Sequence, residues 1–139
     1  MAEVEQQHCF VWKNLALENV LNEIKKGNEN AKTVLAWLLL SGRGGAEKNE
    51  CEAVRLLEER SMNADAEAMW MLGICKEYSL GTEHDTEGAK ALFHNSSDGG
   101  NPIGRILSQK SLGKGDGTID IWCLLLSPLA LLAHLVKFL

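Results

Sequence analysis

The feature that most constrains the fold of this 139-residue chain is an internal repeat. Three short breaks of small or polar residues, Gly27-Asn28, Ala64-Asp65 and Gly100-Asn101, divide the sequence at intervals of 37 and 36 residues. The same order of features recurs between the breaks: an alanine-containing apolar segment, a glycine turn, an acidic or amide stretch, and a second apolar segment. A period of this length is typical of folds in which small helical units stack on one another.

Each interval between two breaks predicts a pair of helices. The predicted helices are Ala31 to Leu40, Glu50 to Met62, Ala66 to Tyr78 and Thr86 to Ser97. The second helix of each pair carries apolar residues at positions i, i+3 and i+4, which gathers them on one helix face. Asn49 and Asp85 lie just ahead of these second helices, where a short polar side chain accepts hydrogen bonds from free backbone N–H groups. Phe10 to Lys26 has the same pattern and predicts the second helix of a preceding unit, or a cap built like one.

Glycine and alanine mark the places where the predicted helices turn and meet. The turns contain Gly42, Gly44 and Gly81, and glycine readily adopts the positive φ angles that other residues resist. Small residues recur inside the helices, at Ala36 and Gly73 in the first helices and at Ala53 and Ala89 in the second. We therefore expect the two helices of each pair to approach closely.

These recurring residues resemble the Sel-1-like repeat family, whose members are relatives of tetratricopeptide repeats with a slightly longer loop. The family's marks in the second interval are Ala68, Leu72-Gly73, Ser79-Leu80-Gly81, Asp85, Ala89, Leu92-Phe93 and Gly100-Asn101. The matching residues of the first interval are Ala31, Leu35-Ala36, Gly42-Arg43-Gly44, Asn49, Ala53 and Leu56-Leu57. The resemblance covers about residues 12 to 106 of the chain.

Both units depart from the family pattern at three places. Leu39 and Lys76 replace an aromatic residue, Glu52 and Gly88 replace a lysine, and Arg60-Ser61 and Ser96-Ser97 replace a closing pair of alanines. The two units are therefore degenerate copies of the family repeat, and the packing inference is firmer than any inference about a binding surface.

The resemblance implies an all-α fold, a short right-handed α-solenoid of antiparallel helix pairs. The solenoid would hold about two full Sel-1-like repeats, an N-terminal helix and a hydrophobic C-terminal helix. A third unit begins near Gly104 and then loses the pattern, because Ser108 and Gln109 stand where the repeat has leucine and glycine. The expected organisation is an N-terminal tail over residues 1–9, the repeat domain over 10–107, a Gly-rich linker over 108–118 and the hydrophobic helix over 119–139.

A stack of this kind buries apolar faces between neighbouring units and presents a concave surface. The resemblance implies a non-enzymatic protein–protein interaction scaffold or adaptor, which binds a protein or peptide and requires no cofactor. The first helices of such folds line the concave face, and the side chains expected there are Lys32, Thr33, Trp37, Glu67, Met69, Trp70 and Lys76. For Trp37 and Trp70 the alternative is a place in the core, since apolar residues at helical spacing are usually buried.

Charge and composition argue against nucleic acid as a partner. The chain has 19 acidic residues against 14 lysines and arginines, a net charge of −5, whereas phosphate binding needs clustered basic side chains. The N-terminal sequence MAEVEQQHCF is polar and acidic, without the basic start and apolar run of a secretory signal. We therefore expect a cytoplasmic protein with no nucleic-acid partner, and the sequence leaves its oligomeric state open.

The cysteines do not form a disulfide framework. Cys9, Cys51, Cys75 and Cys123 are far apart and contain no CxxC pair, so they are expected to be free thiols in a reducing compartment. Cys51 and Cys75 fall on helices that should be neighbours. A disulfide, a two-ligand metal site and two small core residues therefore remain open for this pair, and the core interpretation is favoured.

Catalysis needs a nucleophile, a base or a metal within mutual reach, and the sequence predicts no such set. His84 is expected in a loop beside the capping residue Asp85, and His94 near the C-terminal end of a helix. We therefore expect that the chain is not an enzyme. The rival hypotheses are a hydrolase-type activity, as proposed for some secreted members of the family, and a truncated repeat fragment with only a structural role.

The C-terminal residues form a separate apolar segment. Residues 121–136 contain no Asp, Glu, Lys or Arg. A helix of that length spans about 24 Å against a hydrocarbon core of about 30 Å, and Pro128 would kink or restart it. The side chains of this candidate membrane segment are Ile121, Trp122, Leu124, Leu125, Leu126, Leu129, Leu131, Leu132, Leu135 and Val136.

Three interpretations of the apolar segment remain open. It is a tail anchor that attaches cytosolic repeats to a membrane, a helix that folds back over the open end of the stack, or a product of truncation or alternative splicing with no evolved role. The first interpretation makes the protein membrane-associated rather than cytoplasmic.

Overall fold

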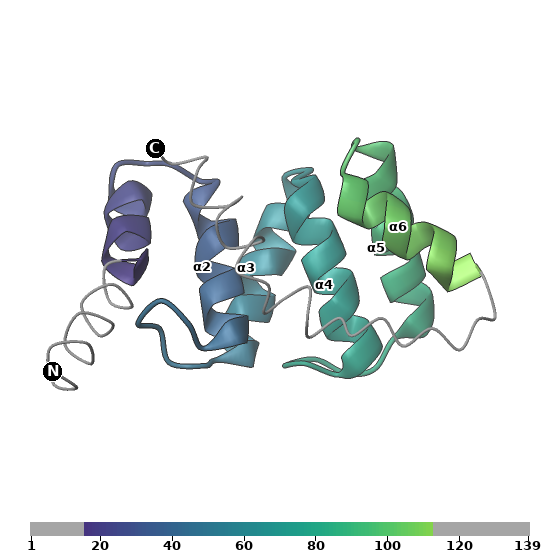
Figure 1. Ribbon diagram of the computed structural model, residues 1–139, viewed down its shortest axis with the longest axis horizontal. Helices are drawn as coiled ribbons and strands as arrows, with labels where there is room; N and C mark the ends of the chain where they lie inside the picture. Colours follow the sequence, from purple (N-terminus) through teal and green to yellow (C-terminus); the bar gives the residue numbers. More distant parts are fainter. Residues whose placement is uncertain (1–15, 113–139) are drawn as a thin grey trace, which may run out of the picture.

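The computed structural model describes residues 16–112, and all regular structure in that range is α-helical. Residues 16–25 are helical, and they are followed by α2 (Ala31–Ser41), α3 (Glu50–Met62), α4 (Ala66–Tyr78), α5 (Thr86–Asp98) and α6 (Pro102–Leu112). Figure 1 shows the helices side by side in chain order, from the purple residues 16–25 at one end to the green α6 at the other. The predicted tail over 1–9 and the predicted hydrophobic helix over 119–139 lie outside the described residues.

The predicted helices agree closely with the observed ones. α3 and α4 have the predicted bounds, and α2 and α5 each continue one residue further. The helix expected over Phe10 to Lys26 is confirmed for residues 16–25. α6 continues to Leu112, through the first five residues of the range 108–118 for which a Gly-rich linker is expected. No proline or glycine interrupts residues 105–112, so the poor match to the repeat pattern there does not end the helix.

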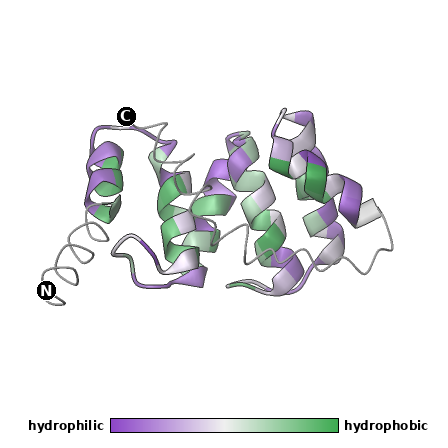
Figure 2. Ribbon diagram, viewed as in Figure 1, coloured by the Kyte–Doolittle hydropathy of each residue, from purple (hydrophilic) through white to green (hydrophobic). Residues whose placement is uncertain are grey.

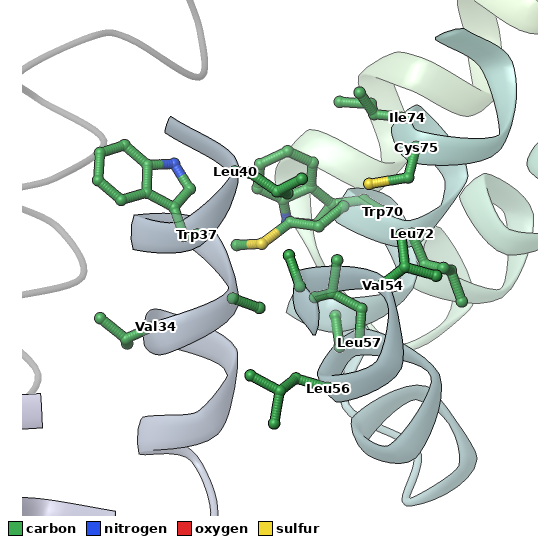
Figure 3. Packing of buried hydrophobic residues seen from close by; sticks show 14 of the residues in the cluster. Val34, Trp37, Leu40, Val54, Leu56, Leu57, Trp70, Leu72, Ile74 and Cys75 are labelled. Carbon is green, nitrogen blue, oxygen red and sulfur yellow. The ribbon is translucent and has the colours of Figure 1, made fainter. Parts of the chain in front are cut away.

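Neighbouring helices enclose one apolar core. Each helix from α2 to α6 packs against the next, and α2 also contacts α4 while α4 contacts α6. Figure 2 shows hydrophobic residues concentrated on α2 and α4, and Figure 3 shows side chains from α2, α3 and α4 meeting in one cluster. The largest fully buried side chains are Trp37, Trp70, Leu38, Leu57, Met71, Ile74, Cys75 and Ser96. The first helices therefore lie in the middle of the core rather than along its edge.

Small residues allow the paired helices to approach closely, as the sequence predicts. Gly73 on α4 faces the ring of Phe93 on α5, and a Cβ atom added to Gly73 would lie 2.5 Å from the ring carbon Cε1. In the first unit the same two positions hold Ala36 and Leu57, both fully buried. The larger ring thus accompanies the smaller residue, so the two units fill similar volumes with different side chains.

The three breaks share one backbone conformation. At each break one residue has a positive φ, namely Gly27 at +89°, Ala64 at +61° and Gly100 at +85°. Its N–H donates to the carbonyl three residues earlier, and the next N–H donates to the carbonyl five residues earlier, with N···O distances of 2.9 to 3.2 Å. This pair of hydrogen bonds is the Schellman motif that closes a helix with a left-handed residue. Residues 16–25 therefore end in the same way as the second helices α3 and α5.

The turns inside the two full units are also alike. Gly42 and Ser79, which follow α2 and α4, have φ angles of +66° and +55°. Asn49 and Asp85, which precede α3 and α5, have φ angles of −143° and −146°. The Asn49 side chain accepts a hydrogen bond from the Glu52 N–H at 3.1 Å, and the Asp85 side chain accepts one from the Gly88 N–H at 2.8 Å. The predicted capping roles are confirmed, and the repeat in sequence is a repeat in backbone conformation.

The complementary sizes of Gly73 and Phe93 can be tested by exchange. Gly73→Ala should lower the free energy of unfolding by about 1 kcal/mol, because overpacking at about 1–3 kcal/mol outweighs the helix preference of about 1 kcal/mol for alanine over glycine. In a Phe93→Leu background the same substitution should instead raise it by up to about 1 kcal/mol, since the pair then matches Ala36 and Leu57. Urea denaturation of the four proteins measures the effect. An effect of the same sign in both backgrounds would contradict the packing described here.

Ala64 is the one break residue that is not glycine, and its left-handed conformation should reduce stability. Such a conformation costs a residue with a Cβ atom about 1–2 kcal/mol. We expect Ala64→Gly to raise the free energy of unfolding by about 1 kcal/mol, and the matched change Gly100→Ala to lower it similarly. Both are measured by urea denaturation, and a loss of stability in Ala64→Gly would contradict the account.

Candidate interaction surface

Three of the side chains expected on the concave face are buried. Trp37, Trp70 and Thr33 expose 0%, 2% and 3% of their surface, so the core alternative holds for both tryptophans and Thr33 is not on the surface. The Trp70 indole N–H donates to Glu67 Oε2 at 3.1 Å, and the Thr33 hydroxyl donates to Asp65 Oδ2 at 2.6 Å. These residues are buried because α2 packs against α3 and α4, and α4 packs against α3, α5 and α6.

The other four expected side chains, Lys32, Glu67, Met69 and Lys76, are half-buried. Lys32 on α2 and Met69 on α4 occupy equivalent positions of their units, and Leu39 is equivalent to Lys76. We define the first-helix stripe as the half-buried residues Lys32, Leu35, Leu39, Met69 and Lys76. Positions separated by three or seven residues share one helix face, so the stripe follows the same face of both helices.

Leu35 and Leu39 were not among the residues expected on this surface. Both pack against the core and keep part of their surface accessible. Aligning the units by their breaks pairs Leu39 with Lys76, and that alignment alone would have identified Leu39. Glu67 is left out of the stripe because its carboxylate accepts a hydrogen bond from the indole N–H of the buried Trp70.

The two lysines of the stripe have different electrostatic surroundings. Lys32 Nζ lies 2.8 Å from Glu29 Oε2 and 2.7 Å from Glu59 Oε1, and the hydrogen bonds that it donates to these carboxylates raise the pKa of Lys32. Lys76 Nζ lies 3.7 Å from Asp85 Oδ2, which is an ion-pair distance but too long for a hydrogen bond. Lys32 is thus compensated within the protein, whereas Lys76 keeps N–H donors that a partner can use.

A polar junction beneath the stripe sets the position of α4 relative to α2 and α3. Asp65 Oδ1 accepts from the backbone N–H groups of Glu67 at 3.0 Å and Ala68 at 3.4 Å, which caps α4. Asp65 Oδ2 accepts from Thr33 on α2 and lies 3.5 Å from Arg60 Nε on α3. One carboxylate thereby joins three helices in a site where a missing partner would leave a buried charge.

The second junction reaches the same geometry with smaller groups. Asn101 Oδ1 accepts from the N–H groups of Ile103 at 2.9 Å and Gly104 at 3.0 Å, as Asp65 does for α4. Ser96, which is equivalent to Arg60, donates its hydroxyl to the Ala66 carbonyl at 2.7 Å. Gly104 is buried against Ser96, where a Cβ atom would overlap the serine side chain. The sequence marked Asn101 as a break residue, Ser96 as a departure from the family pattern and Gly104 as the start of a third unit, without their tertiary contacts.

The structure describes two of the four cysteines and two of the four histidines. Cys51 is exposed and Cys75 is buried, and both are free thiols, so the core interpretation fits Cys75 alone. His84 Nε2 lies 3.0 Å from the Thr86 hydroxyl, and His94 Nε2 lies 3.5 Å from Asp98 Oδ2. Among residues 16–112 there is no group of three or more His, Cys, Asp or Glu side chains that could hold a metal ion.

Within residues 16–112, no helix is both long enough and apolar enough to cross a membrane. The candidate membrane segment lies outside this range. Comparison with family models, with curated proteins and with solved structures found no match for the chain. The Sel-1-like resemblance therefore depends on the residues quoted above.

Burial of Cys75 predicts a pH dependence of stability. Burial, and to a lesser degree the charge of Glu50, raises the pKa of Cys75 from 9.0 to about 12. The unfolded chain loses this proton above pH 9 while the folded chain keeps it, so the thiol favours unfolding between about pH 9 and pH 12. In this window we expect the free energy of unfolding of the wild type to fall by up to about 1.4 kcal/mol per pH unit more than that of Cys75→Ala. Near pH 7 the thiol is protonated in both states, so the two proteins should show the same dependence on pH. Urea denaturation of both proteins at pH 7 and at several pH values within this window measures the difference. If the free energies of unfolding of the two proteins changed in parallel with pH, the burial of Cys75 would be contradicted.

Proposed function

We propose that the chain is a short right-handed α-solenoid of Sel-1-like helix pairs and acts as a non-enzymatic scaffold that binds a protein or peptide on the first-helix stripe. The observation that carries the proposal is the recurrence of one backbone conformation at three breaks and in two turns. We infer that this repeated conformation gives α2 and α4 equivalent positions in the stack, so that their side chains contribute to one continuous surface. Binding by such a surface needs no reacting group and no cofactor.

The side chains of the stripe indicate the chemistry of the partner. Leu35, Leu39 and Met69 supply apolar area, and the methylene groups of Lys32 extend it because its charge is compensated by Glu29 and Glu59. Methionine adapts its shape to varied apolar partners. Lys76 adds hydrogen-bond donors at one end. A matching ligand therefore presents an apolar side chain, with a carboxylate or carbonyl oxygen beside it for Lys76.

The proposal is tested by selecting peptides from a displayed random library on the full chain. Selected peptides should be rich in apolar residues, and their affinity should fall about tenfold or more in Met69→Glu and in Lys76→Glu. Lys90→Glu is the matched control, because Lys90 lies on α5 and pairs only with the exposed Glu87 among the ion pairs of the described residues. Thermal melting checks that each variant stays folded. Peptides that bind all three variants equally, or that depend on Lys90, would contradict the proposal.

A further inference from the structure

α6 is a complete first helix of a third unit. Asn101 caps it through the N–H groups two and three residues later, the same pattern by which Asp65 caps α4. Its 11 residues equal the length of α2. Leu107 is buried, as is Met71 at the equivalent position of α4. The third unit therefore does not end at Leu107, where the sequence pattern weakens.

One side of α6 is uncovered in a way that α2 and α4 are not. Ile106 exposes 49% of its surface, whereas the equivalent residues Thr33 and Trp70 expose 3% and 2%. Thr33 is covered from the next unit, since it contacts Asp65. On the neighbouring helix α5, Leu92 is half-buried while its equivalent Leu56 is buried. The apolar side chains at this end of the stack thus lack the cover that the same positions have in the preceding units.

The sequence after α6 repeats the turn after α2. Gly42 to Asn49 reads GRGGAEKN and Gly113 to Asp120 reads GKGDGTID. Both are eight residues long and begin directly after a first helix, with glycine first and third, a basic residue second and a capping residue last. The first and third positions have positive φ in both full units, at Gly42 and Gly44 and at Ser79 and Gly81. The last residue of each segment is of a type that caps helices, and α3 and α5 each begin directly after such a residue.

We propose that residues 113–120 are the interhelical loop of the third unit and that residues 121–139 are its second helical segment, which packs over Ile106 and Leu92. Eight extended residues reach at most about 28 Å, which is long enough for the apolar segment to return along α6. Residues 121–136 carry no charged side chain, as befits a segment that covers Ile106. Pro128 kinks or ends the helix at its eighth residue. The inference rests on the repeat geometry and not on the proposed binding function.

Hydrogen exchange of the full chain in lipid-free buffer tests the inference. The amides of residues 121–127 should exchange about tenfold or more slowly than in the denatured chain. Gly115→Ala should speed that exchange about fivefold or more, because the equivalent Gly44 and Gly81 have φ angles of +69° and +70°. Gly117→Ala is the matched control, because the equivalent residue of the first unit is already Ala46.

A second pair of variants tests the contact with α6. Ile106→Gln should speed exchange of residues 121–127 and lower the thermal midpoint by about 4 °C or more. The neighbouring Arg105→Gln should do neither, because the equivalent Lys32 and Met69 remain partly exposed. Both variants place the same polar side chain on adjacent residues of α6.

Three results would overturn the inference. The first is exchange of residues 121–127 at the denatured rate without lipid. The second is protection that appears only when phosphatidylcholine vesicles are added and that is unaffected by Gly115→Ala, which is the behaviour of a membrane anchor. The third is protection that falls on dilution together with a dimer in sedimentation, which assigns the cover to a second copy of the chain. None of these results bears on peptide binding by the first-helix stripe.

Discussion

The arrangement of the helices depends on the carboxylate of Asp65. It caps α4 through two backbone N–H groups, accepts a hydrogen bond from Thr33 on α2, and pairs with Arg60 on α3. Each helix pair has an apolar face that it cannot bury alone, and this junction determines how the next pair covers it. The position of Met69 relative to Lys32, and therefore the shape of the first-helix stripe, follows from the same contact.

The units conserve backbone conformation more strictly than side-chain chemistry. A charged Arg60 at one junction corresponds to Ser96 at the next, yet the same helix-closing hydrogen bonds form at both. Gly73 with Phe93 corresponds to Ala36 with Leu57, which exchanges volume between facing helices. Positive-φ residues and capping side chains define the path of the chain, and the core then needs only a suitable total volume. This explains how two units with few identical residues share the same break and turn conformations.

The sequence predicted the parts of the structure that local chemistry determines. The starts of α3, α4 and α5 were predicted correctly, because Asn49, Asp65 and Asp85 are capping residues with nearby hydrogen-bond partners. The burial of Trp37 and Trp70 could not be decided from the sequence, since an apolar residue at helical spacing gives the same pattern whether it lies in the core or on a binding face. The three-helix role of Asp65 was missed because Thr33 is distant in sequence. No helix was predicted at α6 from the sequence, because the resemblance to the repeat weakens at Ser108, although the helix propensity of the residues that follow does not.

The most direct test of the coupled, repeated architecture is native-state hydrogen exchange of the full chain carrying Asp65→Ala, compared with Asp98→Ala. Asp98 is an exposed residue at the end of α5 that pairs with His94, so its removal should leave protection unchanged. We predict that Asp65→Ala lowers the protection of α2 and α3 more than that of α5, because the first unit then opens separately from the second. Equal, small changes in all helices for both variants would contradict the central role of the junction.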